Sequence, residues 1–311
     1  NQLFDDMSLD HIFSTLDENA TFIKNQEGYA DYYPGFGWFG TLESIDNVSM
    51  YKLRMLNDDA IAHRGMPVDV NATELNLEAG WNWVGYTPQV TLDINTALAN
   101  IPDGNGEFLK SQSGYADYYT GFGWFGTLEN MSPFIGYLLR LAADTDFTYN
   151  EGDGLARIAS SSMQTPYDQF DLNIHDYEYN GTMTVALYVD DSRVDTYDYI
   201  LAAYDGLTCV GYTEGLYFPL DGNIIFPLMI YGNDEGNALT FKVYDKLSYT
   251  YLDIDEELEY MHDMQLGDGY NPIVLNTSEI PLEQRISAAY PNPFNPVVNF
   301  DIDLDGEHYV N

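Results

Sequence analysis

The chain has 311 residues, of which 11 are basic and 50 acidic, so its formal net charge is −39. A charge of this size and sign repels nucleic acid and anionic lipid, and we expect neither as a partner. No apolar run approaches the roughly 20 residues that span a bilayer, so we expect no membrane insertion. The 27 Tyr, 16 Phe and 4 Trp residues provide enough apolar surface for a folded core despite the charge.

The first half of the chain contains an internal repeat. GYADYYPGFGWFGTLE over residues 28–43 returns as GYADYYTGFGWFGTLE over residues 114–129, a shift of 114 − 28 = 86 residues. Each copy predicts a short helical piece, then FIKNQ or FLKSQ, an aromatic strand, a glycine turn and a last apolar strand. In the second copy, Ile94, Leu98 and Ile101 recur at helical spacing and predict one amphipathic helix over residues 91–100.

The second copy opens with a strand for which the first copy has no counterpart. WNWVGY over residues 81–86 alternates aromatic and other side chains, as a half-buried strand does. If SLD at Ser8 is matched to TLD at Thr91, the corresponding segment of the first copy falls at or before Asn1. We therefore expect an incomplete sheet at the N-terminus, completed either by residues upstream or by a strand from a neighbouring molecule.

From about residue 146 the pattern changes to short alternating strands separated by turn clusters, from MTVALYVDD to LEYMHDM. Such spacing favours an all-β sandwich. PLEQRISAAYPNPFNP then predicts an exposed connector, and VVNFDIDL a further strand. The predicted fold is mainly β: tandem β-repeat modules with short helices over residues 1–60 and 61–145, an immunoglobulin-like β-sandwich over 146–278, and a linker with the start of another domain over 279–311.

Two resemblances bear on location. AAYPNPFNPVVNFDIDL over residues 288–304 resembles the opening of the C-terminal immunoglobulin-like sorting domains of bacterial proteins exported by type IX secretion. The repeats, with WNWVGYTPQ and GWFGTLENMSPFIGYLLRL, and the sandwich that follows them are similar to modules of large extracellular proteins of such bacteria. These resemblances imply export across the outer membrane and an extracellular or cell-surface location. They imply no particular chemistry.

GFGWFG, present in both copies, fits the G-x-G-x-x-G pattern of dinucleotide-binding loops. That chemistry requires small residues, so that backbone N–H groups approach a pyrophosphate, and a strand that leads into a helix. Here Trp and Phe fill the variable positions, and another strand-like run follows. We therefore interpret the glycines as turn or bulge positions of a β-hairpin.

The aromatic residues of the repeats are the main candidate site. They are too many to share one face of a strand, because neighbouring side chains point to opposite faces. Some are core residues, and exposed ones could contact another subunit or stack on a glycan. The candidates are Tyr32, Tyr33, Phe36 and Trp38, with their counterparts Tyr118, Tyr119, Phe122 and Trp124.

Metal binding and catalysis receive weaker support. Asp103, Asn105 and Glu107 are spaced like the start of a calcium loop, without the full twelve-residue pattern, and Asp190, Asp191 and Asp195 form a second acidic cluster. We interpret both as solvated turns, with calcium as the one possible cofactor. The five histidines show no metal-ligand spacing, and no G-x-S-x-G motif occurs, so we expect no enzymatic activity.

The leading hypothesis is a non-enzymatic extracellular protein that assembles with itself into a filament or surface layer through β-strand pairing. The first sheet is expected to lack a strand, and the C-terminal strand is expected to lack a sheet. If the C-terminal strand of one copy paired with the first sheet of the next, the contact would repeat from copy to copy and build a filament or layer. The strand-exchange candidates are Val297, Val298, Phe300, Ile302 and Leu304. The alternative is a carbohydrate-binding or adhesive module of a larger secreted protein, with a shallow groove lined by Trp38 or Trp124.

Overall fold

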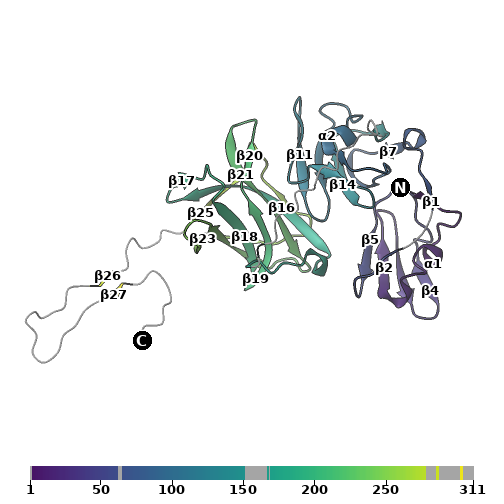
Figure 1. Ribbon diagram of the computed structural model, residues 1–311, viewed down its shortest axis with the longest axis horizontal. Helices are drawn as coiled ribbons and strands as arrows, with labels where there is room; N and C mark the ends of the chain where they lie inside the picture. The colour runs from purple at the N-terminus through teal and green to yellow at the C-terminus, as the bar shows by residue number, and fades with distance from the viewer. Residues whose placement is uncertain are drawn as a thin grey trace, which may run out of the picture. The chain divides into compact units, whose positions relative to one another are not determined.

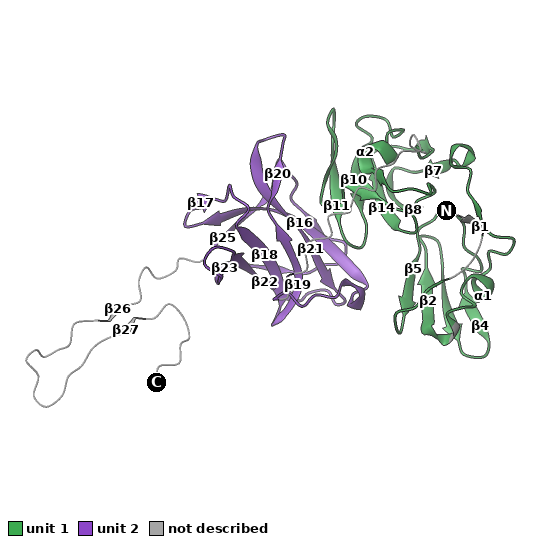
Figure 2. Cartoon of the chain, in the orientation of Figure 1, with its two compact units in different colours: residues 1–166 green, residues 167–311 purple. Residues whose placement is uncertain are grey.

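The computed structural model describes residues 2–61, 65–150, 167, 169–277, 285–286 and 302–303. The chain is mainly β, as predicted. It divides into two compact units, residues 1–166 and 167–311 (Figures 1 and 2), and both sequence repeats belong to the first. Each unit is described below by itself.

Both repeats build an antiparallel sheet next to a single helical turn. In the first repeat, the helix α1 (Leu9–Ile12) precedes the strands β2 (Ala20–Lys24), β3 (Tyr29–Tyr33), β4 (Gly37–Gly40) and β5 (Lys52–Met55), in the sheet order β4-β3-β2-β5. In the second repeat, α2 (Ile94–Ala97) precedes β10 (Gly106–Lys110), β11 (Tyr115–Tyr119), β12 (Gly123–Gly126) and β14 (Gly136–Leu141). Here the order is β12-β11-β10-β14-β8, because β8 (Gly80–Gly85) adds a fifth strand beside β14.

The two sheets share their register. Ile23 lies opposite Ala30 and Leu53, and Leu109, 86 residues later, lies opposite Ala116 and Leu139. The helices follow a different spacing. The Leu9 N–H donates to the Glu43 carbonyl and the Ile94 N–H to the Glu129 carbonyl, so Leu9 matches Ile94 at a shift of 94 − 9 = 85 residues. Matching SLD to TLD was therefore wrong by two residues.

The GFGWFG segments are hairpin turns followed by strands. Gly37 and its counterpart Gly123 have φ of 93° and 106°, which side chains with a Cβ rarely adopt. A Cβ at Gly40 would lie 2.0 Å from the Tyr29 carbonyl oxygen, and one at Gly126 would lie 2.2 Å from that of Tyr115. The glycines therefore serve a tight turn and a close strand approach, as the hairpin interpretation predicts.

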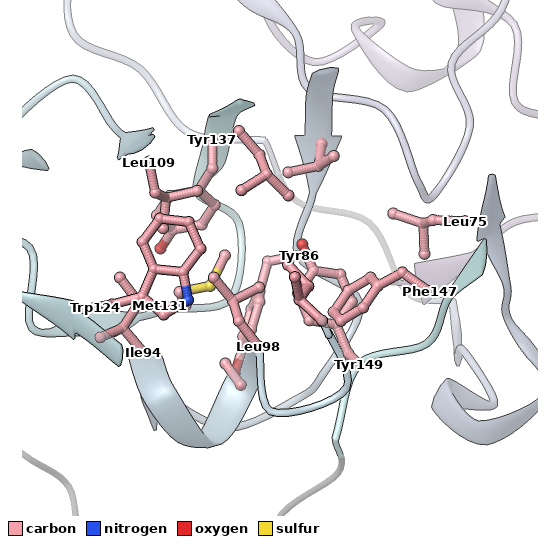
Figure 3. Close-up of a cluster of buried hydrophobic side chains, with 14 of the residues drawn as sticks. Leu75, Tyr86, Ile94, Leu98, Leu109, Trp124, Met131, Tyr137, Phe147 and Tyr149 are labelled. Atoms are coloured by element: carbon pink, nitrogen blue, oxygen red, sulfur yellow. The ribbon is translucent and has the colours of Figure 1, made fainter. Parts of the chain in front are cut away.

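The core of the second repeat lies between its sheet and the segment around α2 (Figure 3). The helix is shorter than predicted: it runs only from Ile94 to Ala97, with the Asp93 side chain accepting from the N–H groups of Asn95 and Thr96. The predicted apolar spacing still marks buried residues, because Ile94, Leu98 and Ile101 all belong to this core. Leu92, at the start of the predicted helix, lies instead in the strand β9 (Leu92–Asp93), which pairs with β13 (Asn130–Met131).

The two repeats contact each other along β8. The Met50 N–H donates to the Trp83 carbonyl at 3.1 Å, and the Gly85 N–H donates to the Val48 carbonyl at 2.7 Å. The Gln26 side chain completes this edge, since it donates to the Trp81 carbonyl at 2.9 Å and accepts from the Trp83 N–H at 2.8 Å. Two ribbons accompany the sheets: β1 (Gln2–Leu3) with β6 (Met66–Pro67), and β7 (Leu75–Leu77) with β15 (Thr145–Phe147).

The second unit contains two sheets that share one core. One has the order β17-β16-β21-β20, and β24 and β25 also pair with β16 in parallel. The other has the order β19-β18-β22-β23. The predicted LEYMHDM strand over residues 258–264 was largely wrong, because β23 ends at Glu259 and the five residues that follow lie outside any strand. The strands are β16 (Tyr179–Val189), β17 (Ser192–Arg193), β18 (Tyr199–Asp205), β19 (Thr208–Glu214), β20 (Leu216–Phe218), β21 (Asn223–Gly232), β22 (Ala238–Asp245), β23 (Thr250–Glu259), β24 (Gln265–Leu266) and β25 (Ile273–Asn276).

Candidate functional site

The first sheet ends at β5, where the second sheet continues onto β8. The residues of β5 match those of β14 at the 86-residue shift: Leu53 corresponds to Leu139 and Arg54 to Arg140. On β14 these two positions lie opposite Asn82 and Trp81 of β8. Among the described residues, no strand lies in the corresponding place beside β5. The edge at β5 is where the sequence predicts a strand from upstream residues or from a neighbouring molecule.

The face of the first sheet that is turned away from α1 is rich in rings and cations. Alternation along β2 to β5 places one set of side chains on this face, and the exposed fractions of Tyr29 and Tyr33 are 51% and 52%. We call it the outer face, and it comprises Phe22, Lys24, Tyr29, Asp31, Tyr33, Phe39, Lys52 and Arg54. It holds three of the chain's 11 basic residues. The whole chain has a net charge of −39, so this basic and partly apolar surface differs from the acidic surface expected for the rest of the molecule.

The matching face of the second sheet is buried. Tyr115 and Tyr119, the counterparts of Tyr29 and Tyr33, are 2% and 7% exposed. Lys110, the counterpart of Lys24, is also buried. The same residue pattern therefore forms a surface in one repeat and an interior in the other.

One side chain of β8, Trp81, lies on this face beside β14. The Arg140 guanidinium lies 5.2 Å from the centre of the Trp81 ring and 5.8 Å from that of Phe108, while the Nε of Arg140 is 2.8 Å from the Glu107 carboxylate. Trp81 in turn meets Phe108 edge to face at 5.9 Å. In the first repeat, Arg54 lies 5.4 Å from the Phe22 ring with no counterpart of the indole among the described residues.

The sequence-predicted aromatic residues divide between the two faces. Tyr32 and Trp38 lie on the face toward α1, edge to face at 5.4 Å, and Tyr118 and Trp124 form the same pair at 5.1 Å. Trp124 is only 4% exposed, and Trp38, half-buried, also packs against Phe13 at 5.5 Å.

The other four candidates lie outside this core pair. Phe36 and Phe122, at the hairpin tips, are exposed, as is Tyr33 on the outer face, whereas Tyr119 is buried. Sequence reasoning missed Phe22, Tyr29, Phe39 and Arg54. Their signal was present, because each is two residues along its strand, or directly across the pair, from another member of the outer face.

The residues of the proposed calcium loop have separate partners. The Asp103 carboxylate accepts from the Tyr118 hydroxyl at 2.6 Å and from the Gly121 N–H at 3.0 Å. These hydrogen bonds, that from Tyr118 first, lower the pKa of the Asp103 carboxyl below its ordinary value. Asn105 accepts from the Ala143 N–H, and Glu107 pairs with Arg140.

No group of three or more His, Cys, Asp or Glu side chains that could hold a metal occurs in the part of the chain that the structure describes. The second acidic cluster is a turn: Asp190 and Asp191, with φ of 49° and 60°, join β16 to β17 in the manner of a two-residue hairpin loop.

Of the strand-exchange candidates, only Ile302 lies in a described segment. It belongs to the two-residue strand β27 (Ile302–Asp303) and lies opposite Ile286 of β26 (Arg285–Ile286). Val297, Val298, Phe300 and Leu304 lie outside the described residues.

Comparisons with protein-family models, with curated proteins and with solved structures found no match. None of the helices described here is long and apolar enough to span a membrane. The arrangement of the first sheet is therefore the principal guide to function.

Proposed function

We propose that this protein is an extracellular structural subunit without enzymatic activity, which assembles with copies of itself through the β5 edge and the outer face of the first sheet. The observation that carries the proposal is the contrast between the repeats. Equivalent tyrosines are exposed on β3 of the first sheet, which ends at β5, and buried on β11 of the sheet that includes β8. Exposed rings and an open edge on one sheet are the usual features of a protein contact.

Strand pairing suits this edge because a strand added to it forms main-chain hydrogen bonds and removes rings from water at once. The outer face also provides charge complementarity. The chain carries a large net negative charge, so the basic patch attracts the acidic surfaces of other copies while the remaining surfaces repel one another. Contact between two different surfaces propagates as a filament or layer instead of closing as a dimer.

The location follows from the sequence resemblances and stays part of the proposal. The YPNPFNP segment and the extracellular-type repeats favour export by type IX secretion and a place outside the cell or at its surface. The strand-exchange donor over residues 297–304 likewise stays a prediction.

Sedimentation velocity over a range of concentrations, with negative-stain imaging, tests the assembly. We expect oligomers that grow with concentration and shrink with salt. Replacing Tyr33 and Phe39 by Ser is expected to remove them without unfolding the chain. Leu247→Ser, on an exposed apolar residue of the second unit, is the control and is expected to leave assembly unchanged. A wild-type chain that stays monomeric at all concentrations contradicts the proposal.

A shortened chain ending at residue 278 tests the predicted donor separately. If residues 297–304 supply the strand, this chain loses assembly while the folds of both repeats persist. Assembly that survives the truncation would place the donor elsewhere. If the Tyr33 and Phe39 substitutions also had no effect, the outer face would not be part of the contact.

The carbohydrate-binding alternative is less well supported, because both tryptophans on which it relied lie on the face toward the helix. What favours it still is the exposed ring of Tyr29, stacked on Phe22 at a centroid distance of 6.1 Å. A polysaccharide array distinguishes the two. Glycan binding that disappears in Tyr29→Ala would favour a carbohydrate-binding module, and an array without signal would count against it.

A further inference from the structure

The second repeat contains a complete version of the edge that is open in the first. β8 lies antiparallel to β14, with Trp81 opposite Arg140 and Asn82 opposite Leu139. Since β5 and β14 share their register with the strands β2 and β10, the neighbour expected beside β5 would place one residue opposite Arg54 and the next opposite Leu53. The chain therefore specifies the orientation of the missing neighbour.

The outer side of this neighbour would meet a partly built aromatic site. In the second repeat an indole lies against both Arg140 and Phe108, and the arginine is also held by Glu107. In the first repeat the arginine and phenylalanine of this group are already in contact, since Arg54 lies 5.4 Å from the Phe22 ring. The Arg54 Nε also donates to the Thr21 hydroxyl at 3.1 Å, which holds the guanidinium near the sheet. Among the described residues, the first repeat lacks only the counterpart of the Trp81 ring in this group. The guanidinium of Arg54 beside the Phe22 ring would attract a second aromatic ring.

The inner side of the neighbour would meet apolar residues that are not fully covered. Leu53 and Met55 are half-buried, whereas their counterparts Leu139 and Leu141 are buried beside β8. β8 contributes Val84 to the core on this side. A strand beside β5 would gain both contacts because its side chains alternate between the two faces.

We infer that β5 is an acceptor for an extended polypeptide strand, antiparallel to β5, that presents an aromatic side chain opposite Arg54, as β8 presents Trp81 opposite Arg140, and small or apolar residues toward Leu53. The inference deepens the proposed function, on which it rests for the idea that the edge is used, by stating the chemistry of the partner. The Arg54–Phe22 pair would select the aromatic side chain of the added strand. Hydrogen bonds to the backbone of Leu53–Met55 would set the direction of that strand.

The test uses the full-length chain at a concentration where it is monomeric and a labelled peptide of residues 78–87, EAGWNWVGYT. We expect fluorescence anisotropy to report saturable binding. Trp81→Ala in the peptide is expected to weaken binding about tenfold, which is the size of a partly desolvated cation–π contact. A scrambled peptide of the same composition is expected not to bind. Equal binding of the scrambled peptide would overturn the inference.

Substitutions in the chain identify the site. Arg54→Ala is expected to weaken binding about tenfold, and Arg54→Lys less, because it keeps the charge but loses the planar guanidinium. Arg140→Ala is the matched control: its indole is already supplied by β8, so peptide affinity is expected to change less than twofold. If Arg140→Ala weakens binding as much as Arg54→Ala, the peptide does not bind at β5.

Hydrogen exchange locates the peptide independently of these substitutions. Exchange of the amides of Leu53–Met55 is expected to slow when the peptide is added, with no change at the other edge of the sheet, Gly37–Gly40. Protection at Gly37–Gly40 alone would overturn the inference. Failure of this inference and failure of the proposed function give different results. A chain that stays monomeric but binds the peptide supports the acceptor and contradicts self-assembly. A chain that assembles but does not bind the peptide supports self-assembly and contradicts the acceptor.

Discussion

The two repeats of the first unit show how much of a residue's environment depends on what lies beside its strand. YADYY occurs in both, and its first tyrosine is half-exposed as Tyr29 and buried as Tyr115. The strands, turns and register are the same. The sheets differ in the exposure of their outer faces and in the fifth strand, β8. An identical local sequence therefore forms an identical hairpin, and the exposure of its outer face does not follow from that sequence.

The largest expected effect comes from the paired tryptophans. Trp124→Ala empties a buried core position and is expected to cost about 3–5 kcal/mol of unfolding free energy, whereas Trp38→Ala, at the half-buried counterpart, is expected to cost roughly half as much. Urea unfolding followed by tryptophan fluorescence measures both, because all 4 tryptophans lie in the first unit. Equal costs would show that the first repeat is as tightly packed as the second.

A pair of asparagines tests the repeats at a shared polar contact. The Asn105 side chain accepts from the Ala143 N–H at 2.7 Å, and Asn19 accepts from the Asn57 N–H at 2.8 Å. Removing the acceptor leaves a donor unpaired, so Asn105→Ala, at a buried site, is expected to cost about 2 kcal/mol and Asn19→Ala about 1 kcal/mol. The same urea experiment checks these values. A larger cost at Asn19 would contradict the proposed difference in burial.

Alkaline pH is expected to act alike on one matched pair of tyrosines, one in each repeat. Burial raises the pKa of Tyr51 and of its counterpart Tyr137 from 10.0 to about 12, against the opposing effect of the backbone N–H groups that each hydroxyl accepts, those of Asp46 and Ser132. Because the folded pKa is raised, this contribution to stability is complete below pH 10 and is lost as the pH rises through about 12.

Urea midpoints measured between pH 9 and 12 are therefore expected to fall. Tyr51→Phe and Tyr137→Phe are each expected to reduce the slope, after correction for their lower stability at pH 9. A slope that neither variant changes would mean that these tyrosines ionise as easily in the folded chain as in the unfolded one.

The smallest expected effect is at the two arginines. Arg140→Ala removes an exposed ion pair and the contact with the Trp81 indole, and is expected to cost about 1 kcal/mol. Arg54→Ala loses only its contacts with Phe22 and Thr21 and is expected to cost less than about 0.5 kcal/mol. Chemical unfolding of the two variants at low salt checks the ranking. A cost for Arg54 that matches or exceeds that of Arg140 would indicate that something already covers this edge.

Much of the fold was predictable from local pattern. Alternation and turn residues indicated the hairpins, and the repeat offset indicated that no segment within residues 1–60 matches Trp81–Tyr86; among the described residues no strand takes that place. The length of α2 was not predictable, because Leu98 and Ile101 are buried after the helix has ended and so imitate helical spacing.

The candidate site was predicted only in part. Tyr33 and Phe36 are exposed as a subunit contact requires, but Trp38 and Trp124 face the core. Alternation shows that neighbouring residues lie on opposite faces without showing which face is covered. The helices cover the face of Trp38 and Trp124, and short helices of this kind leave too weak a pattern in the sequence to reveal that choice.

Hydrogen exchange of the β5 and β14 amides, measured at several protein concentrations, tests the central claim most directly. In the dilute chain we predict fast exchange at Leu53–Met55 and slow exchange at Leu139–Leu141, with protection at β5 rising as the concentration increases. Equal and concentration-independent protection of the two strands would contradict the claim that the first sheet is open at β5 and is completed by another molecule.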